Sequence, residues 1–344
     1  MGIINTKGEW LIEPRFGYAS NFESNGLARA GINENGRVGF INKEGEWVIK
    51  PKFAGVTGFG DSDFAVANSN PADSRWNIVI NKKGEQVLGP YFGTITDFDR
   101  HGRALLTSHG NSRKKLIDIQ GNVLAIHDYI GEFNEYGIAT YQDGSGETNR
   151  IGLIDINGKS VLPREVIEVR GYYQSWGGVL ATITVEKKGR RLKGLIDQKA
   201  HIITEPVFDN IGYDSDRNFD RDGFVRVEKS GKWGLVNNKG EIVLDAIADN
   251  PVYFDNENGL TIVKVNGKSG VLNKKGQWVI KPRFGYIHES SVARGGLILA
   301  LDKNPEDDDA EEYFLDLNGN IVLYSETVEG TRVIKNAKGE ILTW

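Results

Sequence analysis

The fold of this chain is decided by a short stretch that recurs along it, seen most clearly as Gly39-Phe40-Ile41-Asn42-Lys43-Glu44-Gly45-Glu46-Trp47-Val48-Ile49-Lys50-Pro51-Lys52-Phe53. Close copies begin at Gly2 and at Gly270. The fourth position is an Asn or Asp anchor, and the ten anchors are Asn5, Asn42, Asn81, Asp118, Asp155, Asp197, Asn237, Asn273, Asp316 and Asn336. Successive anchors lie 36 to 43 residues apart, except for a last step of 20. Such a period indicates one supersecondary unit that stacks against copies of itself.

Each repeat reads as short strands around a tight turn. A Gly follows the anchor three positions later in nine of the ten repeats, and Ala200 is the exception. An Asn or Asp side chain can accept a hydrogen bond from the backbone two residues on, and Gly tolerates a positive φ. The flanking runs are rich in β-branched and aromatic residues, and alternating runs such as Val225-Arg226-Val227-Glu228 precede them. We predict three or four antiparallel strands in each repeat, and no segment shows sustained helical periodicity.

Two further signals mark the junctions between repeats. A Phe stands four residues before a Gly or an Asp at Phe22, Phe59, Phe98, Phe133 and Phe219. A Pro-x-Phe motif begins nine residues after the anchor at Pro14, Pro51, Pro90, Pro206 and Pro282. We predict that the Phe of the first signal fills the seam between neighbouring repeats, since burial of an aromatic ring removes about 150–250 Å² of surface from water. The Pro is expected to end an edge strand.

The predicted fold class is all-β. Residues 1–344 are expected to form a single domain, a repeat array of about nine antiparallel meander units with a short terminal unit at Asn336. A β-propeller or toroid is favoured, and an open β superhelix is the alternative. The chain begins in the middle of a repeat, at Gly2-Ile3-Ile4-Asn5. Either an upstream segment such as a signal peptide has been removed, which would slightly favour a periplasmic or extracellular location, or the missing strand comes from the C-terminus.

The repeat resembles that of the bacterial WG-repeat family, named for a Trp-Gly pair before an apolar pair, an Asn and a later Gly. The best match is Lys232-Trp233-Gly234-Leu235-Val236-Asn237, and the resemblance covers essentially the whole chain. The Trp of the pair is kept only at Trp233; Val38, Ile151, Lys193 and Ser269 stand in equivalent places. The resemblance implies a β-propeller or a related repetitive β assembly, and most members of the family lack an assigned activity.

The amino-acid composition limits which partners and which kinds of site the protein can have. The formal charge of −5 argues against nucleic acid, which requires a concentrated basic patch. No apolar run approaches the roughly 20 residues of a membrane span. The chain has no Cys, so disulfides and thiolate sites are excluded. Its five His have no metal-ligand spacing, and no Gly-x-Ser-x-Gly motif is present. No cofactor and no catalytic residue is therefore predicted.

Two segments depart from the repeat and are candidate binding sites. Residues 164–178 lack the Pro-x-Phe motif and carry Tyr172, Tyr173 and Trp176, residue types that protein-binding hot spots favour. A diverged seam would explain these aromatic residues nearly as well. The longest insertion carries the acidic residues Glu306, Asp307, Asp308, Asp309, Glu311 and Glu312. This block is either a contact for a cationic partner or a solvated, self-repelling hairpin tip, and the second interpretation is favoured.

Two weaker hypotheses concern calcium and glycans. Asp214, Asp216, Asn218 and Asp220 alternate like the ligands of a calcium loop, but Phe219 and Val225 stand where an EF-hand needs Gly and Glu, so a solvated turn is favoured. Trp10, Trp47 and Trp278 occupy one equivalent position. Exposed rings there could stack on sugars, whereas the fixed register favours packing between repeats.

From these observations we predict a non-enzymatic scaffold that binds another protein. A specific case suggested by the resemblance is an inhibitor or immunity protein that neutralises a bacterial toxin. A cell-envelope glycan-binding module is the alternative, and an enzyme with a site built from loops is the third.

Overall fold

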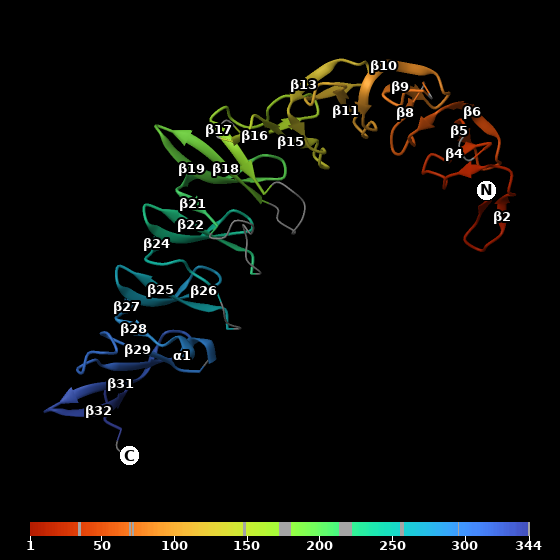
Figure 1. Cartoon of the computed structure of the whole chain (residues 1–344). Helices are drawn as coiled ribbons and strands as arrows, with labels where there is room; N and C mark the ends of the chain where they lie inside the picture. Colours follow the sequence, from red (N-terminus) through yellow and green to blue (C-terminus); the bar gives the residue numbers. More distant parts are fainter. Residues whose placement is uncertain are drawn as a thin grey trace. The chain divides into compact units, whose positions relative to one another are not determined.

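The computed structural model describes residues 1–33, 36–68, 70, 72–146, 149–171, 180–212, 222–254, 258–294 and 296–342. The chain divides into two compact parts, Met1–Arg164 and Glu165–Trp344, which we call the N-terminal and C-terminal segments. Each repeat is numbered by its anchor, from repeat 1 at Asn5 to repeat 10 at Asn336. Strands dominate both segments, as Figure 1 shows.

The N-terminal segment contains repeats 1 to 5. Its strands are β1 (Ile3–Ile4), β2 (Trp10–Ile12), β3 (Tyr18–Ala19), β4 (Ala28–Gly31), β5 (Val38–Ile41), β6 (Trp47–Phe53), β7 (Gly55–Val56), β8 (Phe64–Asn68), β9 (Trp76–Asn81), β10 (Gln86–Ile95), β11 (Arg103–Ser108), β12 (Lys114–Asp118), β13 (Val123–His127), β14 (Tyr129–Ile130), β15 (Ile138–Asp143) and β16 (Arg150–Asp155).

The C-terminal segment contains repeats 6 to 10. Its elements are β17 (Val166–Arg170), β18 (Leu180–Lys187), β19 (Arg190–Asp197), β20 (Ile202–Phe208), β21 (Asn210–Ile211), β22 (Phe224–Lys229), β23 (Lys232–Asn237), β24 (Ile242–Ala248), β25 (Leu260–Val265), β26 (Lys268–Asn273), β27 (Trp278–Phe284), β28 (Tyr286–Ile287), α1 (Glu289–Arg294), β29 (Ile298–Leu301), β30 (Glu312–Leu315), β31 (Ile321–Val328) and β32 (Thr331–Asn336).

The sheets are antiparallel meanders, which confirms the predicted all-β repeat fold. Every strand pairs with a neighbour in sequence, as in the four-stranded sheets β3-β4-β5-β6, β17-β18-β19-β20 and β21-β22-β23-β24. Whether the array closes stays a prediction. The short helix α1 was not predicted. It lies between β28 and β29, and its Val292 is buried in the core of repeat 9.

The predicted turn chemistry is confirmed. The nine Gly residues that follow the anchors have φ between 74° and 83°, and Ala200 takes the same region with φ 65°. The anchor side chain does more than was predicted. In repeat 7, Oδ1 of Asn237 accepts hydrogen bonds from the backbone N–H of Lys239 and of Glu241, both at 2.9 Å. The anchor therefore fixes both the turn and the start of the following strand.

Most of the Pro residues behave differently from the prediction, because the strand continues through them. Pro90 also lies inside a strand, β10, whereas Pro14 lies after the end of β2. Pro51, Pro206 and Pro282 lie inside β6, β20 and β27. Each of these strands is the last in its sheet. A Pro is tolerated there because the outer edge of the sheet needs no backbone donor.

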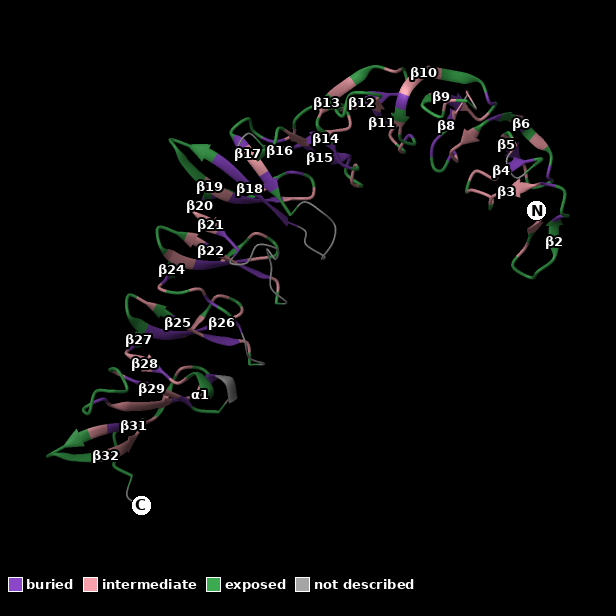
Figure 2. Cartoon of the chain, viewed as in Figure 1, coloured by how far each residue is buried: buried purple, intermediate pink, exposed green. Residues whose placement is uncertain are grey.

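The hydrophobic core lies at the seams, where one repeat packs on the next (Figure 2). In one cluster, Phe40, Ile49 and Phe53 of repeat 2 contact Phe59 and Ile80 of repeat 3. The Phe40 and Phe59 ring centroids are 4.8 Å apart. The predicted seam Phe residues Phe22, Phe59, Phe98 and Phe133 all pack in such clusters, whereas Phe219 lies outside the described residues.

In repeats 2 to 5 and 7 to 9, the turn Gly lies against the repeat before it. A Cβ added to Gly276 would lie 2.2 Å from the backbone oxygen of Val243 in β24. Polar side chains also reach across the seam to the turn: Arg15 donates to the carbonyl of Gly45 at 2.6 Å, and Lys52 donates to that of Gly84 at 2.9 Å. The Gly is thus required both by its positive φ and by the closeness of the neighbouring strand.

Successive repeats are also joined at the hairpins that lie at the other end of the strands from the anchor turns. There an Asp binds a basic side chain of one repeat and a backbone N–H of the next, an arrangement that we call the ion clamp. The carboxylate of Asp249 accepts a hydrogen bond from Lys232 in repeat 7 at 2.6 Å and from the backbone N–H of Gly267 in repeat 8 at 2.8 Å. Within the described residues the same arrangement occurs three times, in the sets Arg113, Asp128 and Gly144; Arg190, Asp209 and Ser230; and Lys232, Asp249 and Gly267. Each Asp therefore bonds two repeats at once.

This clamp predicts a loss of stability in acid. The hydrogen bond from Lys232 and those from the turn backbone hold the pKa of Asp249 below its ordinary value of 3.8. Because the folded-state pKa is the lower one, the stabilisation is complete above the unfolded-state pKa and is lost as the pH falls through the folded-state pKa. We expect the urea concentration at the unfolding midpoint of the wild type to decrease as the pH is lowered below 3.8. The decrease should be smaller in Asp249→Asn. The matched control is Asp245→Asn, an exposed carboxylate on β24, which should keep the wild-type pH profile.

Candidate functional site

Two of the sequence-predicted sites cannot be placed. Tyr172, Tyr173 and Trp176 lie outside the described residues, and so do the weak calcium candidates Asp214, Asp216, Asn218 and Asp220. Both hypotheses stay predictions. Elsewhere among the described residues, no three His, Asp or Glu side chains are grouped as a metal ion would require.

The predicted acidic block forms a folded loop between β29 and β30. Asp309 pairs with Lys303, and the carboxylate of Glu311 accepts a hydrogen bond from the Tyr313 hydroxyl at 2.8 Å. Glu312 lies 3.6 Å from Arg332. Glu306 and Asp308 are exposed and have no ion-pair partner in the described part of the chain. Asp307 accepts a hydrogen bond from the backbone N–H of Asn304 at 3.1 Å. Four of the six carboxylates therefore have a partner within the protein, and two are left for solvent or a partner protein.

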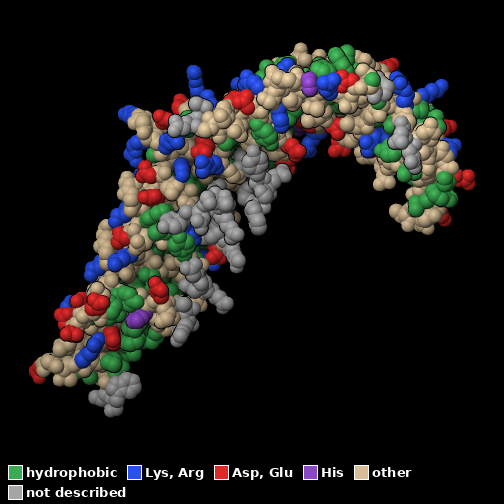
Figure 3. Space-filling model, viewed as in Figure 1, with side chains coloured by type: hydrophobic (Ala, Val, Ile, Leu, Met, Phe, Trp, Pro, Cys, Tyr) green, Lys and Arg blue, Asp and Glu red, His purple; other side chains and the backbone are tan. Residues whose placement is uncertain are grey.

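A basic hairpin was missed by the sequence analysis. The turn between β18 and β19 carries Lys187, Lys188, Arg190 and Arg191 around Gly189, and all four side chains are exposed. Only Arg190 is paired within the described residues, with Asp209 at 2.6 Å. Figure 3 shows Lys and Arg side chains along the edge of the C-terminal segment. Four basic residues in five positions are visible in the sequence, so this signal could have been read.

In repeat 3 the pairing of β9 with β10 is shifted by one residue relative to the other repeats, and an aromatic residue faces outward as a result. In other repeats the Phe of Pro-x-Phe pairs with the residue four before the anchor, as in Val38 with Phe53 and Ser269 with Phe284. In repeat 3 the equivalent Asn77 pairs with Tyr91, and Phe92 pairs with Trp76. A shift of one residue exchanges the two faces of a strand. Tyr91 therefore packs on the core, and Phe92 is left half-buried on the surface.

The surface that results is formed by Arg75, Trp76, Phe92 and His109, and we call it the aromatic–arginine surface. The Arg75 guanidinium carbon lies 4.8 Å from the Phe92 ring centroid. The Trp76 and His109 ring centroids lie 5.0 Å and 4.8 Å from that of Phe92. Trp76 is 37% exposed, and His109 is exposed. One ring is thus flanked by two other rings and a cation, all reachable from solvent.

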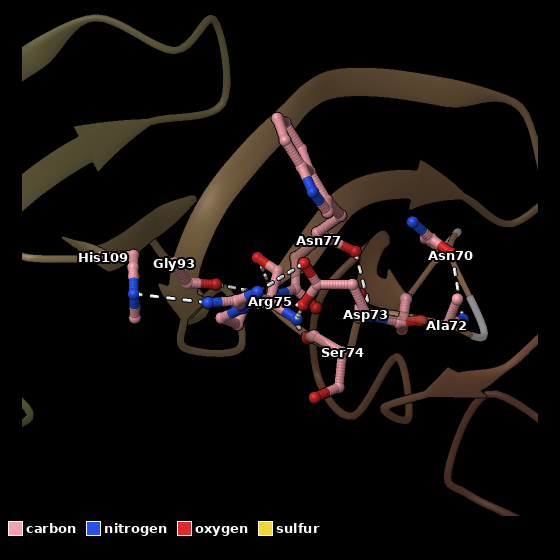
Figure 4. A network of polar contacts seen from close by, with 10 residues as sticks. Asn70, Ala72, Asp73, Ser74, Arg75, Asn77, Gly93 and His109 are labelled. Atoms are coloured by element: carbon pink, nitrogen blue, oxygen red, sulfur yellow. Dashed lines mark hydrogen bonds and ion pairs between the residues drawn. The ribbon is translucent and has the colours of Figure 1, made fainter.

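A network of hydrogen bonds joins the polar residues of this surface, as Figure 4 shows. Arg75 donates to both carboxylate oxygens of Asp73, at 2.7 and 2.9 Å, and lies 3.4 Å from Nε2 of His109. Asn77 donates to the carbonyl of Gly93 at 2.7 Å. The hydrogen bonds from Arg75 hold the pKa of the Asp73 carboxyl below its ordinary value. Asp73 therefore stays ionised and keeps the guanidinium over the ring at neutral pH.

This arrangement is suited to binding a macromolecule. Trp and Arg dominate the hot spots of protein interfaces, and a fixed guanidinium over a ring loses little side-chain entropy on binding. The sequence analysis missed the site. One signal was available: Trp76 stands five residues before its anchor, where other repeats have the basic residues Arg37, Arg113, Arg150, Lys232 and Lys268.

The three Trp residues of the glycan hypothesis have different environments. Trp47 packs edge-on against Phe16 of repeat 1 at 5.5 Å, and Trp278 packs on the cluster between repeats 7 and 8. Trp10 is 56% exposed. Two of the three therefore pack between repeats, as the fixed register indicated.

The only helix in the described part of the chain, α1, has six residues and is too short to cross a bilayer.

Several solved structures are distantly similar to this chain. A crystal structure of the eukaryotic initiation factor matches with a TM-score of 0.36 and 10% identity, over 94% of this chain and 92% of that one. Kluyvelomyces marxianus Hsv2 matches with a TM-score of 0.30 and 9% identity, over 76% of this chain and 95% of the other. Kuenenia stuttgartiensis hydrazine synthase matches with a TM-score of 0.27 and 10% identity, over 77% and 97%. No curated protein matches the chain.

The family comparison agrees with the repeat seen in the structure. The model of the WG containing repeat matches residues 1–36, 39–70, 194–233, 233–268 and 270–297. These matches fall in both segments, and each includes or adjoins an anchor turn described above. The chain belongs to the WG-repeat family.

Proposed function

We propose that the protein is a non-enzymatic scaffold that binds another protein, and that the partner contacts the aromatic–arginine surface. The observation that carries this proposal is the register shift in repeat 3. It places Phe92 on the surface beside Trp76 and Arg75, whereas Phe53 and Phe284, the equivalents of Phe92, are buried. An exposed aromatic group of this kind has no role in holding the stack, so binding is the function that it supports best.

Rigidity supports the same conclusion. The backbone of the surface is joined by hydrogen bonds from His109 N–H to the Phe92 carbonyl at 2.9 Å and from Gly93 N–H to the Arg75 carbonyl at 2.8 Å. A site on paired strands is already ordered before a partner arrives, so binding costs less conformational entropy. A more specific form of this proposal is that the protein is an inhibitor or immunity protein that neutralises a toxin. This finer version rests on the family resemblance.

The test is capture of the partner followed by affinity measurement. Wild-type protein is used to recover a binding protein from an extract of the source organism, and the purified pair is measured by calorimetry. Trp76→Ala and Phe92→Ala should each weaken binding by about thirtyfold, because a hot-spot residue contributes about 2 kcal/mol or more. If the partner proves to be a secreted toxin, the finer version is supported as well.

A matched control is available in the C-terminal segment. Tyr253 is 39% exposed, and the guanidinium carbon of Arg226 lies 3.9 Å from the centroid of its ring. Tyr253→Ala should bind the partner like the wild type. Equal binding by Trp76→Ala and Tyr253→Ala would refute the assigned surface. Deletion of residues 305–311 tests the acidic loop in the same assay, and loss of binding in that variant alone would move the site there.

A further inference from the structure

The hairpins of repeats 6, 7 and 8 lie side by side in the C-terminal segment. Their tips are residues 186–191, 228–232 and 264–268, which together we call the basic row. The ion clamps hold neighbouring tips together, because Asp209 links the first tip to the second and Asp249 links the second to the third. Stacked sheets lie about 10 Å apart, so the row is about 20 Å long.

The row is strongly basic, although the chain as a whole has a formal charge of −5. Its only carboxylates are those of Glu186 and Glu228, against the basic residues Lys187, Lys188, Arg190, Arg191, Lys229, Lys232, Lys264 and Lys268. Four positive charges remain in excess when the two clamp carboxylates are also counted. The row therefore attracts anions even though the chain is acidic overall.

The tip of repeat 6 projects beyond the other two. Its strands β18 and β19 have eight residues each, whereas the corresponding strands of repeats 7 and 8 have six. The two additional cross-strand pairs are Glu186 with Arg191 and Lys187 with Arg190, and they extend the hairpin by about 7 Å. Lys188 and Gly189 have φ 50° and 73°, as a type I′ turn requires. An ordered and fully exposed hairpin thus presents these cations to solvent.

We propose that the basic row binds an extended acidic segment of a partner protein. An extended polypeptide advances about 3.3 Å per residue, so about every third side chain meets the next tip. Arg191 suits this partner because a guanidinium can bind a carboxylate through two hydrogen bonds. The tips contain no aromatic residue on which a nucleic-acid base could stack. The tip of repeat 6 also has no apolar side chain that could enter a bilayer.

The acidic loop of repeat 9 sets the end of the row. Lys268 donates to the carbonyl of Asp302 at 3.4 Å, so this loop begins beside the tip of repeat 8. Its exposed carboxylates Glu306 and Asp308 repel an anionic segment, which is therefore held over repeats 6 to 8. The basic row lies in the C-terminal segment and the aromatic–arginine surface in the N-terminal one, so this inference does not rest on the proposed function.

The experiment is a fluorescence anisotropy titration of the full chain with a labelled peptide of about eight Glu residues, about 27 Å long when extended. The wild type should bind the peptide at low ionic strength, and added salt should weaken binding because exposed ion pairs are screened. The triple variant Lys187→Gln, Lys188→Asn and Arg191→Gln should raise the Kd about tenfold, since each exposed ion pair contributes about a factor of two. Asn tolerates the positive φ at this position, as Asn266 does in repeat 8.

The matched control removes three Lys residues from anchor turns of the same segment, as Lys239→Gln, Lys275→Gln and Lys338→Gln. All three are exposed, and Gln stands at the equivalent place in repeat 4, at Gln120. This control has the same net charge as the triple variant and should bind the peptide like the wild type. Trp76→Ala should do so too, so that failure of this proposal can be told apart from failure of the proposed function.

Two results would overturn the proposal. One is equal loss of peptide binding in the triple variant and its control, because binding would then follow net charge rather than the basic row. The other is a wild type that does not bind the peptide. If that protein bound heparin, duplex DNA or phosphatidylserine vesicles instead, the row would be assigned to another class of anion.

Discussion

Phe40→Ala is expected to lower the free energy of unfolding by about 3–5 kcal/mol, the usual cost of removing a buried Phe side chain. Phe40 is fully buried and its ring lies 4.8 Å from that of Phe59, across the seam between repeats 2 and 3. Its loss leaves a cavity between two repeats, lined by Ile49, Phe53 and Ile80 on paired strands. The substitution should therefore uncouple the two repeats.

Urea unfolding followed by circular dichroism measures this effect. The control is Val48→Ala on the adjacent strand β6, where the side chain is 44% exposed. A surface substitution of this kind should change the free energy of unfolding by less than about 0.5 kcal/mol. If Phe40→Ala were as stable as Val48→Ala, the seam would not be where the stabilising core lies.

The repeat period and the turns were predictable from sequence because each turn has local chemistry. An Asn or Asp followed by Gly three positions later dictates a hairpin whatever surrounds it, and Asn237 and Gly240 behave as that rule requires. The seam Phe residues were predictable for a related reason, since an aromatic residue at a fixed register packs in every copy. The helix α1 was not, because six residues carry no periodicity.

The candidate site was not predictable, because it depends on a register that the motif conceals. Pro90-Tyr91-Phe92 matches the Pro-x-Phe pattern, so the motif itself does not mark the shifted register. The structure pairs Asn77 with Tyr91 and puts Phe92 on the surface. His109 lies in the connection between β11 and β12, far from Arg75 in the sequence. Only the folded sheet brings the two residues together. Pairing register is a property of the assembled sheet rather than of one strand.

Stacking of the repeats depends on the contact between the turn Gly and the repeat before it, and Gly276→Ala tests that contact. Gly276 has φ 77°, and a Cβ there would lie 2.2 Å from the Val243 oxygen. The control is Gly231→Ala, with φ 75° and no atom within 4 Å of the added Cβ. Both variants lose about 1–2 kcal/mol to the left-handed backbone. Only the first must also displace a strand of the neighbouring repeat.

The most direct measurement is the free energy of unfolding of these two variants, determined side by side in urea. We expect Gly276→Ala to be less stable than Gly231→Ala by about 1–3 kcal/mol, the usual cost of forcing extra atoms into a packed interior. Equal stability of the two variants would contradict the account, since it would mean that the turn of repeat 8 does not rest on repeat 7.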